Sequence, residues 1–164
     1  MLRRISIQNE DFDLGAEWAR LRAERGGASG AMAAFCGVVR DRIGSDSVSG
    51  LELEHYPGMT ERSIEAIIER AERRWRLDAV VVIHRVGALG PGDQIVLVLA
   101  TSQHRQDALE ACAFLIDLLK TEAVLWKRET TPKGARWIES TAADQRRSTE
   151  WTSPPPSAPV SEEG

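Results

Sequence analysis

The run A-V-V-V-I-H at residues 79–84 is rich in β-branched residues and has no polar residue before its final histidine. An uninterrupted apolar run of this length is typical of a strand that is buried on both faces of a sheet. A second buried strand is predicted at residues 94–101, after the turn residues Pro91 and Gly92. The two runs therefore predict a central sheet that is covered on both faces.

Shorter segments predict the strands around this centre. Five of them follow from apolar or alternating patterns: residues 5–7, 30–40 (buried), 51–56 (one face exposed to solvent), 123–130 and 135–140. The last two are joined by Pro132-Lys133-Gly134 and are expected to form a hairpin. The polar residues 41–47, which include Gly44, are expected to be a loop.

Three helices are predicted from apolar residues at helical spacing, with Asp13, Thr60 and Ser102 as their N-caps. Gly26-Gly27 ends the first helix. The third helix, residues 103–122, is apolar most of the way round, so we expect more than one neighbouring element to cover it.

The composition of the chain favours one domain. A length of 164 residues with 42% hydrophobic residues suits a single globular domain, which we place at residues 1–151. Residues 152–164 are rich in proline and are expected to be a disordered tail. The sequence has no long apolar span and no cleavable signal, so a cytoplasmic location without membrane contact is predicted.

The net charge and the cysteine positions argue against several classes of function. A formal net charge of -4 argues against non-specific binding of nucleic acid, which needs many contacts from Lys and Arg to phosphates. Cys36 and Cys112 lie in apolar surroundings without metal-ligand spacing, so both are expected to be core residues. No metal site and no cofactor is predicted.

Against this acidic background, one stretch of the chain is locally basic. It contains five cations: Lys120, Lys127, Arg128, Lys133 and Arg136. Within the sequence L-L-K-T-E-A-V-L-W-K-R-E at residues 118–129, two lysines stand among apolar neighbours, which would lower their pKa and make them usable for proton transfer. On the lysines alone, a plainer interpretation is favoured, in which Lys120 interacts with the negative end of its helix and Lys127 is solvated.

The predicted start of the long helix carries His104 and Arg105, although a helix N-terminus favours acidic residues. A bound phosphate or carboxylate would explain these cations. A pairing of Arg105 with Asp107, Glu110 or an acidic residue of a neighbouring loop would explain them nearly as well. Arg40, at the end of a predicted strand, is a third cation whose usual role would be a salt bridge.

Six motifs together resemble one known family. They are F-C-G-V-V-R (35–40), L-E-H-Y-P-G-M (53–59), V-V-I-H-R-V-G (81–87), P-G-D (91–93), T-S-Q-H-R (101–105) and L-K-T-E-A-V-L-W-K-R-E (119–129). In order and spacing, from about residue 30 to 138, they resemble the large, catalytic subunit of molybdopterin synthase.

This resemblance implies an α+β protein with an α/β hammerhead-like fold and a small additional antiparallel β subdomain. It also implies a homodimer within a heterotetramer, with a small ubiquitin-like sulfur-carrier subunit at each end. The carrier's C-terminal Gly-Gly thiocarboxylate would enter a pocket of this chain. Sulfur would pass to cyclic pyranopterin monophosphate and form the dithiolene of molybdopterin, so the chain would be a sulfurtransferase of molybdenum cofactor biosynthesis.

The resemblance also implies the site residues. The substrate-binding positions are Val38, Val39, Arg40, His104, Arg105, Lys120, Lys127, Arg128 and Glu129, of which Lys120 and Lys127 form the catalytic pair. Of these, Val38 can offer only its backbone. Glu129 is expected to orient Lys127 or Arg128 rather than to act as a base. The cations would bind the phosphate and the carboxylate-like tail.

Helix geometry adds a condition to this site. Arg105 and Lys120 are fifteen residues apart on one predicted helix, which separates them by about 22 Å. If both serve one site, His104 and Arg105 must come from a neighbouring subunit. Two other hypotheses remain open at this point: a non-catalytic scaffold that grips an acidic C-terminal tail, and a thiol enzyme that uses Cys36.

Overall fold

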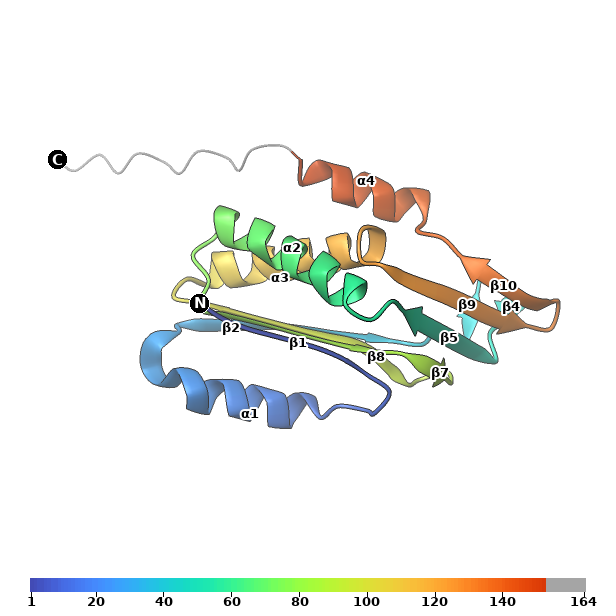
Figure 1. Ribbon diagram of the computed structural model, residues 1–164, viewed down its shortest axis with the longest axis horizontal. Helices are drawn as coiled ribbons and strands as arrows, with labels where there is room; N and C mark the ends of the chain where they lie inside the picture. Colours follow the sequence, from blue (N-terminus) through green and yellow to red (C-terminus); the bar gives the residue numbers. More distant parts are fainter. Residues whose placement is uncertain (153–164) are drawn as a thin grey trace.

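The computed structural model describes residues 1–152 (Figure 1). The chain forms, in order, β1 (Leu2–Gln8), α1 (Leu14–Arg25), the short 3₁₀ turn η1 (Gly26–Ala28), β2 (Ala31–Val38), β3 (Arg42–Ile43), β4 (Asp46–Ser47), β5 (Gly50–His55), α2 (Met59–Arg74), β6 (Ala79–Arg85), β7 (Gly87–Leu89), β8 (Gln94–Ser102), α3 (Arg105–Thr121), β9 (Leu125–Thr131), β10 (Gly134–Ile138) and α4 (Ala142–Glu150). The fold is therefore mixed α+β.

The first sheet has the strand order β1-β6-β8-β2, with β1 parallel to β6 and the other neighbours antiparallel. In Figure 1, α1 covers one face of this sheet, and α2 and α3 cover the other. Every residue of β6 from Ala79 to His84 is buried. This confirms the prediction of a central strand that is covered on both faces.

The two faces of β6 contribute to two separate cores. Val80 and Val82 pack with α2 and α3, whereas Val81 and Ile83 pack with residues of α1. A fully buried valine or isoleucine side chain contributes about 1.5–3 kcal/mol, so this strand is a main source of stability for the domain.

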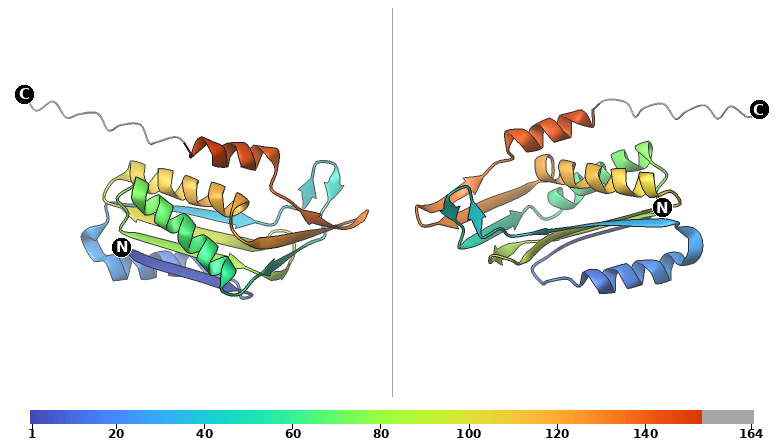
Figure 2. Two further views of the ribbon diagram at one scale, coloured as in Figure 1. Left: turned by 45° about the horizontal axis from the view of Figure 1, so that its top comes forward. Right: turned by 180° about the vertical axis from the view of Figure 1, so that it is seen from behind.

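The second sheet is antiparallel throughout and has the strand order β10-β9-β5-β7. It continues from one end of the first sheet, as both views in Figure 2 show. The predicted hairpin is confirmed by β9 and β10. On β5, Leu51 and Leu53 are buried and Glu54 is exposed, so the predicted solvent-exposed face is also confirmed.

Two of the predicted N-caps were wrong. The cap of α2 is Gly58, and Thr60 is instead fully buried inside the first turn, where its hydroxyl donates to the Val124 carbonyl at 2.7 Å. The cap of α3 is His104, because Ser102 still belongs to β8. The hydroxyls of Thr60 and Ser102 thus donate long-range hydrogen bonds, to the carbonyls of Val124 and Arg76, instead of capping a helix. Asp13 caps α1 as predicted, accepting from the Ala16 N–H at 3.0 Å.

Three segments differ from the sequence-based prediction. β2 is only partly buried because it is the edge strand of the first sheet. The expected loop at residues 41–47 contains the small hairpin β3–β4, which turns at Gly44 with φ of 61°. Helix α4 was not predicted, and it packs along α3. With β2, β8 and α2 on its other sides, α3 is covered by several neighbours, as expected.

Over residues 1–152, no helix is long and apolar enough to cross a membrane. The prediction of a disordered tail at 152–164 falls, Thr152 apart, outside the described residues.

Candidate functional site

Lys120 and Lys127 lie where the first sheet meets the second. Lys120 is in the last turn of α3, and the chain then passes through a short turn into β9, which carries Lys127. The Lys120 Nζ lies 3.5 Å from Asp144 Oδ1 on α4, and the Lys120 side chain is 48% exposed. The plainer interpretation of Lys120, as a cation at the negative end of its helix, therefore fits its position.

Lys127 has a different environment. On β9 it pairs with Leu53 of β5 and Ile138 of β10, both of which belong to the apolar cluster between the sheets. Burial lowers the pKa of Lys127 below its ordinary value, the positive charge of Lys120 lowers it further, and Asp144 partly opposes both effects. The interpretation of Lys127 as a solvated strand residue was thus wrong.

Asp144 is a site residue that the sequence analysis missed. It lies on α4, whose N-terminus is a capping box in which Thr141 accepts from the Asp144 N–H at 3.1 Å and donates to the Asp144 carboxylate at 2.8 Å. Partial burial on its own would raise the pKa of Asp144, but hydrogen bonds from Thr141 and the charge of Lys120 hold it below its usual range. The spacing T-x-x-D was the signal that could have revealed this helix.

The end of β2 lies at the same end of α3 as Lys120. β2 begins opposite Ser102, just before α3 starts, and both elements run in the same direction along β8. Val38 is 51% exposed, whereas Val39 is buried and bonds through its backbone to the Asp93 carbonyl and the Gly92 N–H. Arg40 is exposed and makes no ion pair among residues 1–152, so the expected strand-end salt bridge is not formed there.

Arg128 and Glu129 point to opposite faces of β9, because side chains alternate along a strand. Arg128 pairs with Glu52 and stacks 5.6 Å from the centroid of Trp137. Glu129 is buried on the face that carries Lys127, and its Oε2 lies 3.3 Å from Arg136 Nη2. The expectation that Glu129 orients Lys127 or Arg128 is therefore corrected: its partner is Arg136.

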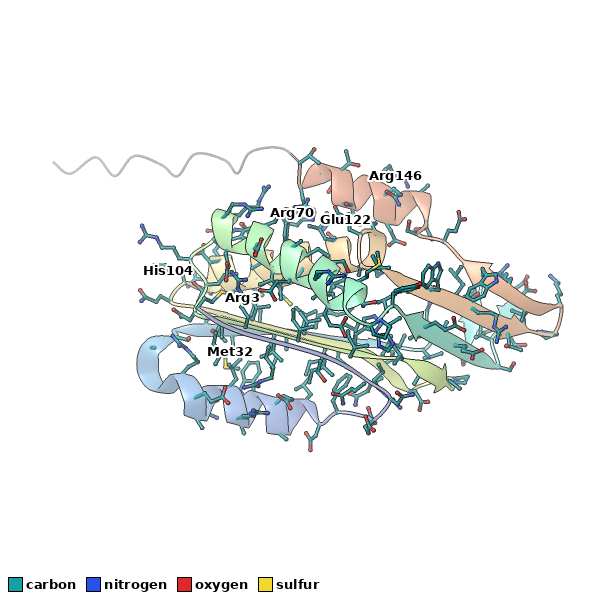
Figure 3. All side chains as sticks on the ribbon, in the orientation of Figure 1. Arg3, Met32, Arg70, His104, Glu122 and Arg146 are labelled. Atoms are coloured by element: carbon teal, nitrogen blue, oxygen red, sulfur yellow. The ribbon has the colours of Figure 1, made fainter. Side chains whose placement is uncertain are left out.

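His104 and Arg105 lie at the far end of α3 from Lys120. Figure 3 shows His104 and Glu122 at opposite ends of this helix. Both His104 and Arg105 are exposed. Glu110 accepts hydrogen bonds from Trp75 at 3.0 Å and Gln106 at 2.9 Å, and Arg105 forms no ion pair within the described part of the chain. One chain therefore does not bring its two cationic groups together.

The cysteines are poor candidates for a nucleophile. Burial raises the pKa of Cys36, with a smaller contribution from Asp11, and burial raises the pKa of Cys112 to about 11. A raised pKa reduces the thiolate fraction at neutral pH, which argues against a mechanism based on Cys36. Among residues 1–152, no group of three or more His, Cys, Asp or Glu side chains could hold a metal ion.

The described residues form an α+β protein in which Lys120 and Lys127 lie near the junction of two sheets and interact electrostatically. The family model described as "MoaE protein" matches residues 7–122, and the chain belongs to this family. The chain is 52% identical over 147 residues to the molybdopterin synthase catalytic subunit of Ralstonia nicotianae, covering 90% of this chain and 83% of that protein.

Two solved structures resemble the fold. The molybdopterin biosynthesis MoaE protein from Burkholderia ambifaria has a TM-score of 0.79 at 49% identity, over 93% of this chain and 99% of that chain. The complex of subunits 1 and 2 of the molybdopterin-converting factor from Helicobacter pylori has a TM-score of 0.64 at 20% identity, over 87% of this chain and 92% of that chain. The second likeness concerns the fold alone.

Proposed function

We propose that this chain is the sulfur-transferring catalytic subunit of a molybdopterin synthase, with Lys120 and Lys127 as its catalytic pair. The proposal is carried by one observation: a partly buried lysine with a lowered pKa lies within the electrostatic field of a second lysine, in a chain whose relatives are named molybdopterin synthase catalytic subunits.

The two lysines suit different steps of this chemistry. Lys127 has a lowered pKa and therefore gives up its proton more readily than an ordinary lysine, which suits proton transfer as sulfur attacks the pterin and the cyclic phosphate opens. Lys120 is half exposed and paired with Asp144, and it suits the stabilisation of an anionic intermediate that enters from solvent. Each product molecule requires two such sulfur transfers.

The anion-binding groups would come from two chains. The Arg40 side chain and the Val38 backbone lie at the Lys120 end of α3, where they can meet the substrate. Val39 is buried and its backbone bonds to Gly92 and Asp93, so it would support this end of the strand without binding the substrate directly. His104 and Arg105 lie at the opposite end, so in a homodimer they would complete the pocket of the neighbouring subunit. Glu129, on the face of β9 that carries Lys127, would act at the border of the pocket together with its partner Arg136. Arg128 would act from the opposite face of β9, together with its partner Glu52.

The proposed assembly is a heterotetramer, in which each end of the homodimer holds a small ubiquitin-like carrier subunit with a C-terminal Gly-Gly thiocarboxylate. The name "catalytic subunit" of the relatives is consistent with a second kind of subunit. We classify the fold as α/β hammerhead-like, with the second sheet as the additional antiparallel subdomain, and we place the enzyme in the cytoplasm.

Reconstitution tests this function. The full chain is mixed with a thiocarboxylated carrier and cyclic pyranopterin monophosphate, and mass spectrometry follows both the dithiolene product and the conversion of the carrier terminus to a carboxylate. The expected result is product that carries two sulfur atoms, with two carriers consumed per product. If the carrier binds but keeps its sulfur in the presence of substrate, the chain is a scaffold and the proposal is wrong.

A further inference from the structure

His84 is a buried ionisable residue that the proposed mechanism does not use. It is only 4% exposed and is the last residue of β6 on the face that α2 and α3 cover, following Val80 and Val82. Its neighbours in the register of the first sheet are Ile7 on β1 and Val96 on β8. A polar ring among such apolar neighbours needs a partner.

One ring nitrogen of His84 has a partner that determines the tautomer. The Nδ1 atom lies 2.9 Å from the carbonyl oxygen of Arg85. A carbonyl oxygen can only accept, so Nδ1 carries the proton and Nε2 of the neutral ring is left as an acceptor. The Arg85 side chain is anchored by the carbonyls of Asn9 and Gln94, at 3.2 and 3.1 Å. The orientation of the His84 ring is therefore restrained from its Nδ1 side.

Lys127 and His84 border the same apolar cluster at the junction of the sheets. Ile7, the register neighbour of His84, packs into the apolar cluster that also contains Leu53 and Ile138, the two residues that flank Lys127. The positive charge of Lys127 contributes to lowering the pKa of His84, after the larger effect of burial. The charges that act on Lys127 come from Lys120 on α3 and Asp144 on α4.

We propose that His84 is a positioning residue for Lys127, whose Nζ donates a hydrogen bond to His84 Nε2 through one bridging water. The catalytic part of this inference depends on the proposed function, but the contact itself does not. His84 would hold the half-buried ammonium group of Lys127 at the junction of the sheets. The residues that flank Lys127 on the neighbouring strands, Leu53 and Ile138, are apolar.

The role of His84 is that of an acceptor rather than of an acid or base. Burial lowers the pKa of His84 to about 4, against the effect of its hydrogen bond with Arg85, and the positive charge of Lys127 lowers it further. The ring is therefore neutral at pH 7. To act as a general acid, the ring would have to carry a second proton and a positive charge at this pH. A neutral acceptor stabilises the ammonium form of Lys127, so loss of the acceptor lowers the pKa of Lys127.

Two substitutions separate the two ring nitrogens. His84→Asn keeps a donor near the Nδ1 position for the Arg85 carbonyl and removes the distal acceptor. His84→Gln can place an acceptor oxygen near the Nε2 position. The pKa of Lys127 is measured by NMR through its side-chain Cε signal, and kcat and KM are measured with thiocarboxylated carrier and cyclic pyranopterin monophosphate.

We expect the pKa of Lys127 to fall by about one unit in His84→Asn and to return toward the wild-type value in His84→Gln. With an active enzyme, kcat should fall on the order of 10- to 100-fold in His84→Asn, with little change in KM. An unchanged pKa of Lys127 in folded His84→Asn would overturn the proposal even if the chain proves to be the sulfurtransferase.

A measurement on the wild-type protein tests the proposal even if the variants do not fold. The ¹⁵N shifts of His84 should show a protonated Nδ1 and a hydrogen-bonded, unprotonated Nε2 at pH 7. A proton on Nε2 would contradict the proposal directly. If the pKa effect is observed but no sulfur transfer occurs with any chain, the positioning contact stands and the proposed function fails.

Discussion

The two ends of α3 carry the same kind of charge in opposite settings. At the C-terminal end, Lys120 pairs with Asp144, and Lys127 is partly buried with a lowered pKa. At the N-terminal end, His104 and Arg105 are exposed. This difference supports the proposed division of roles. Burial and a neighbouring like charge change the proton affinity of a lysine, whereas an exposed arginine can only bind an anion that arrives from outside.

The largest effect is expected when a cation is removed from the C-terminal end of α3. Lys120→Ala should reduce kcat on the order of 10²- to 10⁴-fold, the usual contribution of general acid–base catalysis. Fold and carrier binding should survive, because Lys120 is half exposed at a helix end. Single-turnover sulfur transfer with preformed carrier complex gives the rate, and Lys133→Ala is the matched control, since Lys133 pairs with Asp46 in the hairpin region. Near-normal turnover by folded Lys120→Ala would remove Lys120 from the mechanism.

The second test asks whether the two ends of α3 meet across a dimer. Arg105→Ala and Lys120→Ala homodimers are mixed and allowed to exchange subunits. Activity is measured at a substrate concentration well below KM, where both homodimers are nearly inactive. In each mixed dimer one pocket collects both lesions and the other is intact, so about a quarter of wild-type activity should return after complete exchange. Native mass spectrometry verifies the exchange. Persistent inactivity despite verified exchange would show that each pocket uses one chain only.

Removal of the exposed cation should have a smaller effect of a different kind. Arg105→Ala loses a charged hydrogen bond to an anion, which is worth about 1.5–3 kcal/mol and corresponds to an increase in KM of about 10- to 100-fold. The defect in rate should shrink at saturating substrate if Arg105 binds the ground state and the transition state equally. Arg20→Ala on α1 is the control, because Arg20 is an exposed helix arginine paired with Glu24. An unchanged KM would argue against a role in phosphate binding.

The smallest effect is expected from a substitution of Asp144, the acidic residue that pairs with Lys120 at the C-terminal end of α3. Asp144 favours the charged form of Lys127, but less than burial and Lys120 oppose it. Asp144→Asn should therefore lower the pKa of Lys127 further and move the Lys127-dependent limb of the pH–rate profile to lower pH. NMR titration of Lys127 and the pH dependence of kcat measure the shift, with Asp46→Asn as the control. A shift to higher pH would contradict the assigned sign.

Much of the fold could be predicted because its signals are local. The buried run in β6, the alternation in β5 and the spacing of apolar residues in α1 and α3 are properties of neighbouring residues along the chain. The capping residues were harder to predict. Thr60 and Ser102 have hydroxyls that suit a cap, but their partners are the carbonyls of Val124 and Arg76, which only tertiary packing brings near.

The site divides in the same way. The sequence by itself determined that two lysines have apolar neighbours along the chain and that Arg105 is a helix length away from Lys120, because both follow from residue order and the rise of a helix. Only the tertiary structure decided that Asp144 of α4 lies close to Lys120 and that Arg128 and Glu129 pair with Glu52 and Arg136. It also decided that His84 and Lys127 border the same apolar cluster. These contacts join residues on different secondary-structure elements, and no local period or propensity encodes which elements will pack together.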